Sequence, residues 1–428
     1  MKVAVVGAGW AGLSAAVEMA RRGAQVTVYE AAGQTGGRAR RVSHEGIDLD
    51  NGQHVLLGAY CETLRLLTTV GIDLDEAFAR LPLTLHFPDL FELSAFSSLP
   101  APIHLLAGLL TARGLDRREK IAAIRFVIAM RLRGFRIAPD MDLGKLLALY
   151  RQPHKVVRFL WAPLCVAALN TPTDIASAQV FLNVLRDTFT RSRKDSDLLL
   201  PRVDLSALFP DPAEAFIKAR GGLVNCGAAV SAIYAASAGW VVGCQGLEEV
   251  FQSVVCAVPP YVAARLLETT APQVARAMRM FSYEPIVTCY LQYSDSASLL
   301  RPMIGLAGEL GQWAFDREQL GGPSGLVAVV ISAAAHVREL DHATLARKID
   351  AELRKQVGHM PQLRWQRVIT EKRATFRCIP GLARPGVDSG LRGLYLAGDH
   401  VENGYPATLE GAVRSGLAAG RAVASRTG

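Results

Sequence analysis

The chain has 428 residues; half are hydrophobic, a fifth are charged, and the formal net charge is +8. This length suffices for two or three hydrophobic cores, and the composition excludes disordered and fibrous proteins. The positive charge suits an acidic membrane surface, an anionic ligand or nucleic acid. The basic residues are scattered among apolar ones and form no nucleic-acid-binding motif, so we expect no nucleic-acid partner.

The cysteines are odd in number and include no C-x-x-C pair; they occur at positions 61, 165, 226, 244, 256, 289 and 378. They indicate neither a disulfide framework nor a metal site, and we expect most to be small buried residues in a reducing cytoplasm. A Gly-rich turn interrupts the first apolar run, which argues against a signal peptide. The longest uncharged run, 221–247, is broken by glycines, serines and Asn225, so it favours strands over a membrane-spanning helix.

Residues 2–30 predict a strand, a Gly-rich turn, a helix and a second strand that ends on Glu30. In this G-x-G-x-x-G pattern Gly7 permits the tight turn, Gly9 lets backbone amides approach a pyrophosphate, and Gly12 allows close helix–strand packing. The pyrophosphate would lie at the positive end of the helix. The acid favours an unmodified adenosine ribose, and hence FAD or NAD rather than NADP. The alternative is a Gly-rich tight turn without a ligand.

Three further stretches decide between FAD and NAD. Gln34-Thr-Gly-Gly-Arg38 and Asp48-Leu-Asp-Asn-Gly-Gln-His54 follow the second strand, and 394–416 holds a strand closing on Gly-Asp before a helix. Together they resemble the GG-doublet signature and C-terminal segment of the amine oxidase and phytoene desaturase superfamily of flavoproteins. The resemblance implies FAD as cofactor.

The resemblance also assigns cofactor contacts. It implies that the doublet and Arg38 lie along the phosphates and ribityl chain, that Asp399 binds the same region, and that the helix starting at Thr408 points at the flavin ring. It further implies that Val230 touches the adenine through its backbone and that the strand ending at Ala257 lies beside the cofactor. The implied cofactor-binding residues are Gly7, Gly9, Gly12, Glu30, Gly36, Gly37, Arg38, Gly52, Gln53, Val230, Ala257, Gly398, Asp399, Thr408 and Leu409.

The fold class we expect is α/β: a Rossmann-type FAD-binding domain of the amine oxidase kind with an inserted α+β substrate domain. We assign 1–78, 206–262 and 386–428 to the FAD-binding domain. The substrate domain would comprise 79–205, mostly helical with a short strand around 83–87, and 263–385, which alternates like a sheet and includes a helix over 342–357.

Residues 100–136 combine an apolar stretch with a basic helix. Over 113–136 there are eight basic and two acidic residues, a pattern that suits an anchor lying on a membrane surface. The alternative is a core helix with a solvated basic rim, since Phe126 and Met130 fall outside the stripe of Ile121, Ile124 and Ile128. We expect a cytoplasmic protein and leave open peripheral attachment to the inner face of the cytoplasmic membrane.

Three stretches, 49–60, 161–171 and 176–187, resemble the bacterial squalene-associated FAD-dependent desaturases, also called hydroxysqualene dehydroxylases. The resemblance implies reductive removal of the hydroxyl of hydroxysqualene to give squalene, in hopanoid or other triterpenoid biosynthesis, with hydride from N5 of reduced flavin. The alternatives are a carotenoid or other polyene desaturase, a flavin amine oxidase, and a membrane-associated protein with structural FAD.

The reaction needs a proton donor, and His54 is the first candidate. Its alternative role is a hydrogen bond to the cofactor or to a neighbouring carbonyl. Asn170 and Asp187 are candidates for orienting the hydroxyl, although Asn170 before Thr-Pro equally fits a helix C-cap. We expect no metal site. No second G-x-G-x-x-G is present for a nicotinamide domain, so electrons would come from a diffusible or protein donor that the sequence does not name.

Overall fold

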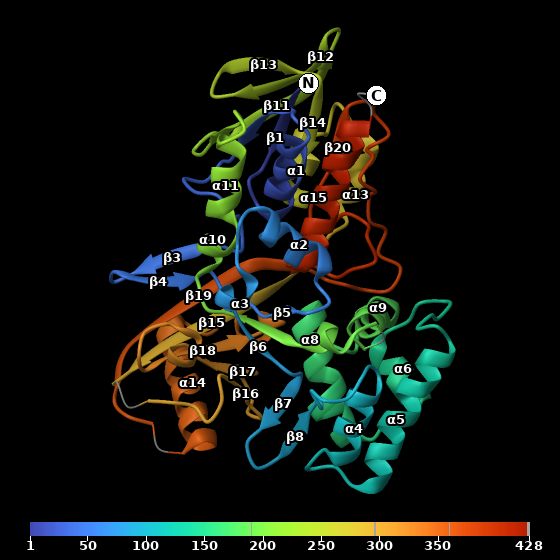
Figure 1. Ribbon diagram of the computed structural model, residues 1–428, viewed down its shortest axis with the longest axis vertical. Helices are drawn as coiled ribbons and strands as arrows, with labels where there is room; N and C mark the ends of the chain where they lie inside the picture. Colours follow the sequence, from blue (N-terminus) through green and yellow to red (C-terminus); the bar gives the residue numbers. More distant parts are fainter. Residues whose placement is uncertain (190, 295–296, 359, 426–428) are drawn as a thin grey trace.

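The computed structural model describes residues 1–189, 191–294, 297–358 and 360–425. Figure 1 shows two parts stacked along the long axis, with both termini at the upper end. The upper part contains a parallel sheet. The lower part contains an antiparallel sheet beside a group of helices.

The parallel sheet has the strand order β10-β2-β1-β14-β20. Its strands are β1 (Lys2–Val6), β2 (Gln25–Tyr29), β10 (Leu223–Asn225), β14 (Ser253–Cys256) and β20 (Leu394–Leu396). The central strands are continuous apolar runs because helices or other strands cover both faces of a parallel sheet. All five strands come from the three segments assigned to the cofactor domain, and the predicted α/β Rossmann-type class is confirmed.

Two helices pack closely beside this sheet, α1 (Trp10–Arg21) and α15 (Leu409–Ala424). A Cβ added at Gly416 would lie 2.1 Å from the carbonyl oxygen of Ala11, so the two backbones touch. Further elements of the upper part are α2 (Cys61–Thr69), α3 (Leu74–Ala77), α10 (Leu205–Leu208) and α11 (Pro210–Lys218), with the hairpin β3 (Arg41–His44) and β4 (Ile47–Asp50) at its lower edge.

An antiparallel sheet at the upper end comprises β11 (Val230–Ala236), β12 (Gly239–Cys244) and β13 (Leu247–Phe251), as the uncharged run predicts. The helices α12 (Pro260–Leu266) and α13 (Pro272–Arg279) follow β14. Between them, the hydroxyl of Thr270 donates to the carbonyl of Ile233 in β11. This contact attaches 263–279, which the sequence places in the substrate domain, to strands on the cofactor side.

The lower sheet is antiparallel with the order β16-β17-β18-β15-β19. Its strands are β15 (Tyr283–Tyr293), β16 (Met303–Gly305), β17 (Trp313–Asp316), β18 (Leu326–Ile331) and β19 (Leu363–Phe376), with short 3₁₀ turns η3 (Glu318–Leu320) and η4 (Ala334–Val337). The helix α14 (His342–Val357) has the predicted bounds, and its Ile349 and Leu353 join the core of this sheet. The long strand β19 runs from this sheet toward the upper part (Figure 1).

The other half of the lower part is mainly helical, as predicted for 79–205. Its helices are α4 (Ile103–Thr111), α5 (Arg117–Leu132), α6 (Leu143–Leu149), α7 (His154–Val156), α8 (Ala162–Leu169) and α9 (Ala178–Phe189), with the π-helical turn η1 (Val157–Trp161) and the 3₁₀ turn η2 (Arg193–Ser196). It holds more strand than the expected piece at 83–87. The strands are β5 (Leu56–Leu57), β6 (Phe78–Leu81), β7 (Thr84–Phe87), β8 (Phe91–Ser94) and β9 (Leu198–Pro201).

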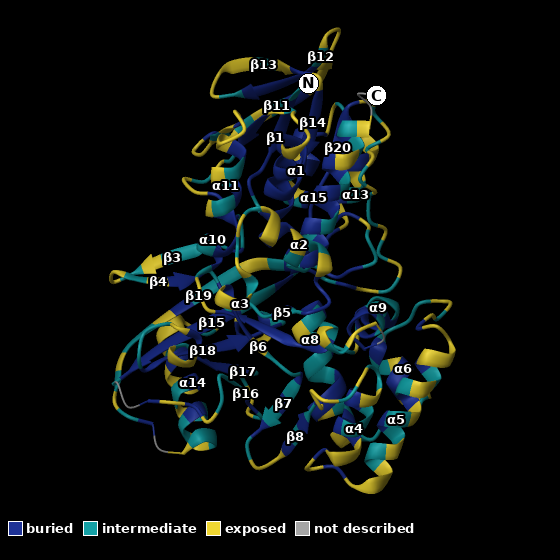
Figure 2. Cartoon of the chain, in the orientation of Figure 1, coloured by how far each residue is buried: buried dark blue, intermediate teal, exposed yellow. Residues whose placement is uncertain are grey.

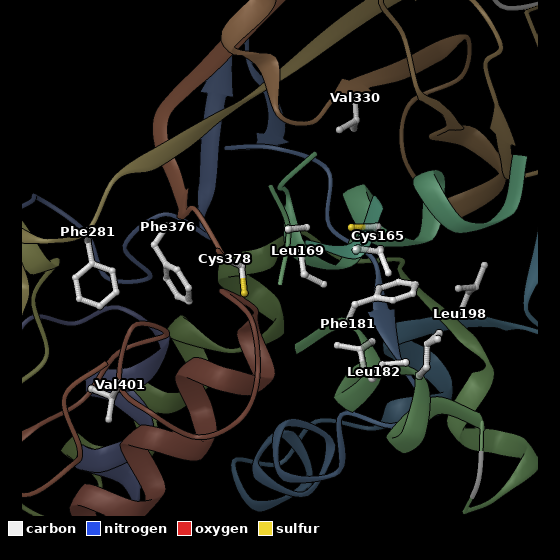
Figure 3. Close-up of a cluster of buried hydrophobic side chains, with 14 of the residues drawn as sticks. Cys165, Leu169, Phe181, Leu182, Leu198, Phe281, Val330, Phe376, Cys378 and Val401 are labelled. Carbon is white, nitrogen blue, oxygen red and sulfur yellow. The ribbon is translucent and has the colours of Figure 1, made fainter. Parts of the chain in front are cut away.

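A continuous hydrophobic core joins the two parts, and Figure 2 shows buried residues running through both. Figure 3 shows one region of it, where Phe281 and Phe376 pack at 5.5 Å between ring centroids near Cys378 and Val401. Because this core is shared, the position of the lower part relative to the parallel sheet is fixed by packing.

Within the described part of the chain, no helix is long and apolar enough to cross a membrane. All seven cysteines are free, and four of them, Cys165, Cys256, Cys289 and Cys378, are buried.

Candidate flavin site

The turn between β1 and α1 has the geometry that the glycine pattern predicts. Gly7 has φ +103°, and its N–H donates to the carbonyl of Tyr29 at 2.7 Å. A Cβ at Gly12 would lie 1.9 Å from the carbonyl oxygen of Gly7. A Cβ at Gly9 would meet only the Cα of Gly37, at 4.0 Å, so this glycine leaves open space above the N-terminus of α1.

Glu30 lies directly at this turn. One carboxylate oxygen accepts from the backbone N–H of Ala8 at 2.7 Å and the other accepts from Ala32 at 2.9 Å. The carbonyl of Glu30 accepts from Ala228, which brings the start of β11 with Val230 beside the acid. The Glu30 carboxylate therefore lies beside the position that the ribose of a nucleotide bound at this turn would occupy.

The Gly36–Gly37 doublet packs onto the same turn. The N–H of Gly36 donates to the carbonyl of Ala8, and a Cβ at Gly37 would lie 3.1 Å from the Cα of Gly9. On the other side, a Cβ at Gly7 would lie 2.7 Å from the carbonyl oxygen of Ala257. Thus the turn at 7–12, the doublet at 36–37 and the end of β14 at Ala257 meet around one backbone cradle.

Arg38 joins this cradle to the C-terminal segment. Its Nη2 donates to a carboxylate oxygen of Asp399 at 2.7 Å, and its Nη1 donates to the carbonyl of Ala374 in β19 at 2.6 Å. Burial would raise the pKa of Asp399, but the charges of Arg38 and His400 outweigh it and hold that pKa well below its usual range. Asp399 is therefore ionised at neutral pH.

Hydrogen bonds to and within α15 fix the position of the C-terminal segment. The N–H of Gly398 donates to the hydroxyl of Ser415 in α15, and the Thr408 side chain caps α15 by accepting from Gly411. Leu409 is the first residue of that helix. Glu410 is fully buried and accepts from the backbone N–H groups of Glu62 and Thr63, so it caps the N-terminus of α2 as well.

The segment at 50–54 meets β15. Gly52 has φ +121°, and a Cβ there would lie 3.6 Å from the Oγ1 of Thr288. The Gln53 side-chain oxygen accepts from Arg317 at 3.0 Å. The Nδ1 of His54 lies 2.8 Å from the carbonyl oxygen of Gly52. Since a carbonyl only accepts, Nδ1 carries the proton and Nε2 holds the lone pair in the neutral ring. Burial lowers the pKa of His54, with a further contribution from the charge of Arg38.

Four buried side-chain atoms around these segments find no hydrogen-bond partner among the described residues: Arg40 Nε, Tyr283 Oη, Thr288 Oγ1 and His400 Nε2. Unsatisfied buried polar atoms are costly, so a native protein leaves such groups for a ligand or water. Together with the glycine cradle, they fit a polar cofactor that runs from the turn of α1 past Asp399 to the start of α15. No group of three or more His, Cys, Asp and Glu side chains gathers as metal ligands in the described part of the chain.

The other two catalytic candidates lie elsewhere. Asn170 is the C-cap of α8 with φ 47°; its amide donates to Thr375 at 2.9 Å and to the carbonyl of Glu284, and its oxygen accepts from Ala333. Its hydrogen-bonding groups are thus engaged by backbone and side chain, which favours the cap over a role in orienting a hydroxyl. No hydrogen bond or ion pair recorded for the described residues links Asn170 to His54.

Asp187 accepts from the hydroxyl of Tyr405 at 2.8 Å and from Arg186 at 2.9 Å. It lies at an open recess of about 630 Å³ whose other lining residues are Cys61, Glu62, Arg186, Arg191, Arg414 and Arg421. This recess is polar and cationic, so it does not suit an isoprenoid chain. The structure therefore groups His54 with the glycine and Arg38 segments, and links Asp187 to the C-terminal segment through Tyr405.

Sequence reasoning missed several residues of the site. Arg384 donates to the carbonyls of Asp399, His400, Val401 and Tyr405, and so fixes the loop that leads to α15. Asp50 is buried, and burial raises the pKa of its carboxyl to about 6. His400 could have been found from its place directly after Gly-Asp. No local pattern marks Arg384, Tyr283 or Thr288, because only the tertiary fold brings them to the cradle.

A family model described as flavin-containing amine oxidoreductase matches residues 10–424. The chain belongs to the flavin-containing amine oxidoreductase family. It is therefore a flavin-dependent oxidoreductase, and the superfamily predicted from the GG-doublet is confirmed.

Comparison with individual curated proteins shows which flavin-dependent enzymes the chain is similar to. The chain is 34% identical to hydroxysqualene dehydroxylase of Rhodopseudomonas palustris, over 98% of this chain and 99% of that protein. It is 28% identical to hydroxysqualene dehydroxylase of Zymomonas mobilis, over 97% of each chain. It is 26% identical to 15-cis-phytoene desaturase of Synechococcus elongatus, over 100% of this chain and 96% of that protein. The predicted resemblance to hydroxysqualene dehydroxylases is confirmed.

Solved structures confirm the fold. A triple mutant of putrescine oxidase superposes with a TM-score of 0.76 at 16% identity, over 99% of each chain. Cyclohexylamine oxidase from Brevibacterium oxydans gives 0.71 at 14% identity, over 100% of this chain and 99% of that chain.

Proposed function

We propose that the protein binds FAD and uses the reduced flavin to replace the hydroxyl of hydroxysqualene with hydrogen, giving squalene. The similarity to hydroxysqualene dehydroxylases along nearly the whole chain is the observation that carries this proposal. FAD is favoured over a mononucleotide because Glu30 and the open space at Gly9 provide for an adenosine ribose and a pyrophosphate.

The reaction divides into loss of water and addition of hydride. Protonation of an allylic hydroxyl lets it leave as water and generates an allylic cation, which a hydride then converts to the hydrocarbon. Bound reduced flavin supplies that hydride. The residues of this chain must deliver one proton, hold the isoprenoid, and exclude water that would recapture the cation.

His54 is the residue we propose for the proton. Its Nδ1–H is committed to the carbonyl of Gly52, so a proton passed to the substrate is carried on Nε2 of the imidazolium. A Cβ at Gly52 would lie 3.6 Å from the Oγ1 of Thr288 and 3.9 Å from the Cε1 of His54, so a glycine and a short polar side chain lie next to the ring. Asn170 and Asp187 act, in this proposal, through the fold: Asn170 by capping α8 and Asp187 by fixing Tyr405.

Two partners follow from this chemistry. The flavin must be reduced in each turnover, so the proposal includes an electron donor, either a diffusible reductant or a protein. A thirty-carbon isoprenoid alcohol partitions from water into bilayers, so the proposal also includes work at a membrane surface.

An anaerobic half-reaction tests the function. The purified protein is checked for FAD, reduced chemically, and mixed with hydroxysqualene in detergent. Return of the oxidised flavin spectrum with one squalene per flavin is the expected result. A flavin that stays reduced would overturn the dehydroxylase assignment.

The same preparation examines the second candidate, an oxidative polyene desaturase, which the similarity to a phytoene desaturase favours. In that case oxidised enzyme mixed anaerobically with a polyene would bleach its flavin. A bound FAD that neither reductant nor substrate alters would instead indicate a structural cofactor.

A further inference from the structure

The helix α5 has two distinct apolar faces. Phe126 and Met130 are buried, with 1% and 0% of their surface exposed, and they pack into the core beside Ala123. On the outer side Ile121, Ile128 and Leu132 are 54%, 45% and 83% exposed. Spacings of seven and four residues place these three on one stripe of the helix. The apolar residues of α5 therefore form two stripes: one with Phe126 and Met130 that packs into the core, and one with Ile121, Ile128 and Leu132 that faces solvent.

The neighbouring helix α4 extends this outer surface. Ile103 and Leu110 are 52% and 60% exposed and stand seven residues apart on α4. Figure 2 shows exposed segments on α4 and α5 at the lower right of the molecule. Isolated exposed leucines need no explanation, but exposed apolar stripes on two adjacent helices mark an interaction surface. We call Ile103, Leu110, Ile121, Ile128 and Leu132 the α4–α5 face.

Unpaired cations surround this face. Six arginines of α5 and its flanks make no ion pair with any residue that the structure describes: Arg117, Arg118, Arg125, Arg131, Arg133 and Arg136. The two acids of the segment are used locally, because Asp116 and Glu119 form the capping box at the start of α5. The surface thus presents apolar side chains among net positive charge, which complements a layer of anionic headgroups above acyl chains.

A narrow apolar groove opens between the two helices. It measures about 60 Å³, and its exposed lining is almost entirely apolar. Its lining includes Leu105 and Leu109 of α4 and Val127, Ile128 and Arg131 of α5. Leu160 and Trp161 of η1 and Leu164 of α8 also line it. This space is far too small to hold a thirty-carbon chain.

We propose that the α4–α5 face docks on the surface of an anionic lipid bilayer and that the groove is the point where an isoprenoid chain passes from the bilayer into the protein. Docking needs only the exposed apolar stripes and unpaired arginines, whereas the entrance role rests on the proposed function. A basic, apolar surface of this kind would place the groove at the depth where acyl chains begin.

Vesicle binding tests the docking. The FAD-loaded protein is sedimented with vesicles of phosphatidylcholine alone or with phosphatidylglycerol added. We expect at least tenfold more binding to the anionic vesicles, with a steep loss at high salt. Equal binding to both compositions, or none to either, would overturn the proposal.

Matched double variants locate the surface. Ile121→Ser/Leu132→Ser removes exposed apolar groups from the α4–α5 face and should reduce vesicle binding at least tenfold. Leu247→Ser/Met280→Ser, at residues 77% and 73% exposed on β13 and after α13, is the control and should bind as the parent does. Flavin content and thermal unfolding check that both doubles fold. If both double variants reduce vesicle binding equally, the α4–α5 face is not the docking surface. If the parent protein dimerises and only the Ile121→Ser/Leu132→Ser variant is monomeric, the face binds a second copy of the chain instead of a membrane.

The half-reaction separates the entrance from the chemistry. With hydroxysqualene presented in anionic vesicles, the Ile121→Ser/Leu132→Ser variant should reoxidise its flavin at least tenfold more slowly than the parent. With the substrate in detergent the two rates should match. Equal rates in vesicles would overturn the entrance role, whereas failure of both proteins in detergent would count against the proposed reaction and leave vesicle binding to decide the docking.

Discussion

At the scale of single residues, one hydrogen bond determines which nitrogen of His54 is available. The carbonyl of Gly52 holds Nδ1 in its protonated form, and burial lowers the pKa of the ring below the ordinary value of 6.5. The neutral ring offers Nε2 as an acceptor, and the imidazolium offers it as a donor. The proton-donor role that we propose therefore requires the minority form at neutral pH.

A pH profile follows directly. If His54 donates the proton, the single-turnover rate of flavin reoxidation should be highest below its pKa and should fall as pH rises through a midpoint under 6.5. The His54→Gln variant should retain FAD, and its flavin reoxidation should be slower by about 10²-fold or more. The fall of the rate with rising pH should be absent from this variant. A profile that the substitution leaves unchanged would remove His54 from the mechanism.

At the scale of elements, a single carboxylate joins two helices of the upper part. Glu410 lies in the first turn of α15, is fully buried, and accepts from the backbone N–H groups at the start of α2 and from the Thr63 hydroxyl at 2.7 Å. Arg414, one turn later, donates to it at 2.7 Å. The acid of the Thr-Leu-Glu segment thus stabilises a contact that keeps the start of α15 in place.

Glu410→Ala should lower the free energy of unfolding by about 3 kcal/mol, because it leaves the α2 amides and Arg414 without their buried partner. Glu410→Gln, which can still accept one of these bonds, should cost less. The midpoint of urea unfolding measures the difference. Glu339→Ala, at a carboxylate whose side chain is 84% exposed, should stay within about 0.5 kcal/mol of the parent. Similar midpoints for Glu410→Ala and Glu339→Ala would contradict the capping role.

The helix α5 shows where periodicity fails at this scale. Its apolar residues fill both a core stripe and an outer stripe, so the pattern could not say which side is buried. The helix itself was predictable from the sequence, whereas its capping box was found only in the structure. Its orientation depends on Phe126 packing 5.0 Å from the Trp161 ring, a contact between segments that no local signal pairs.

At the scale of the whole molecule, the sequence predicts those parts of the site that rest on local backbone geometry. Gly7, Gly12 and Gly36 stand where a Cβ would collide and Gly37 has φ +61°, and the order of strand, turn and acid is visible along the chain. Arg384 and Tyr283 were not predictable, because no local motif marks either residue and only the fold shows that Arg384 donates to the carbonyls of the 399–405 loop. The sequence around Asn170 was consistent with a helix C-cap and with a residue that orients the substrate hydroxyl. The hydrogen bonds of its amide nitrogen and oxygen within the protein favour the cap.

Among the ion pairs that join the two ends of the chain, the pair of Arg38 and Asp399 has members separated by 361 positions and lies at the cofactor cradle. The Asp399 side chain is 8% exposed and that of Arg38 is 38% exposed, so removing Arg38 leaves a poorly solvated carboxylate beside the cofactor cradle. We expect Arg38→Gln and Asp399→Asn each to lower the flavin-to-protein ratio of the purified protein. The double variant should lose less free energy of unfolding than the two single variants lose in sum, with a coupling free energy of about 1–3 kcal/mol.

The pair between Lys2 and Glu249 provides the control. It has the same separation of 2.7 Å, but its side chains are 39% and 43% exposed. Solvent and side-chain entropy reduce such a pair to about 0–1 kcal/mol, and its removal should leave the flavin content unchanged. Additive losses at Arg38 and Asp399 would mean that each residue acts alone. A coupling that exceeds the surface pair, together with loss of flavin, would mean that the two ends of the chain build the cofactor site as one unit.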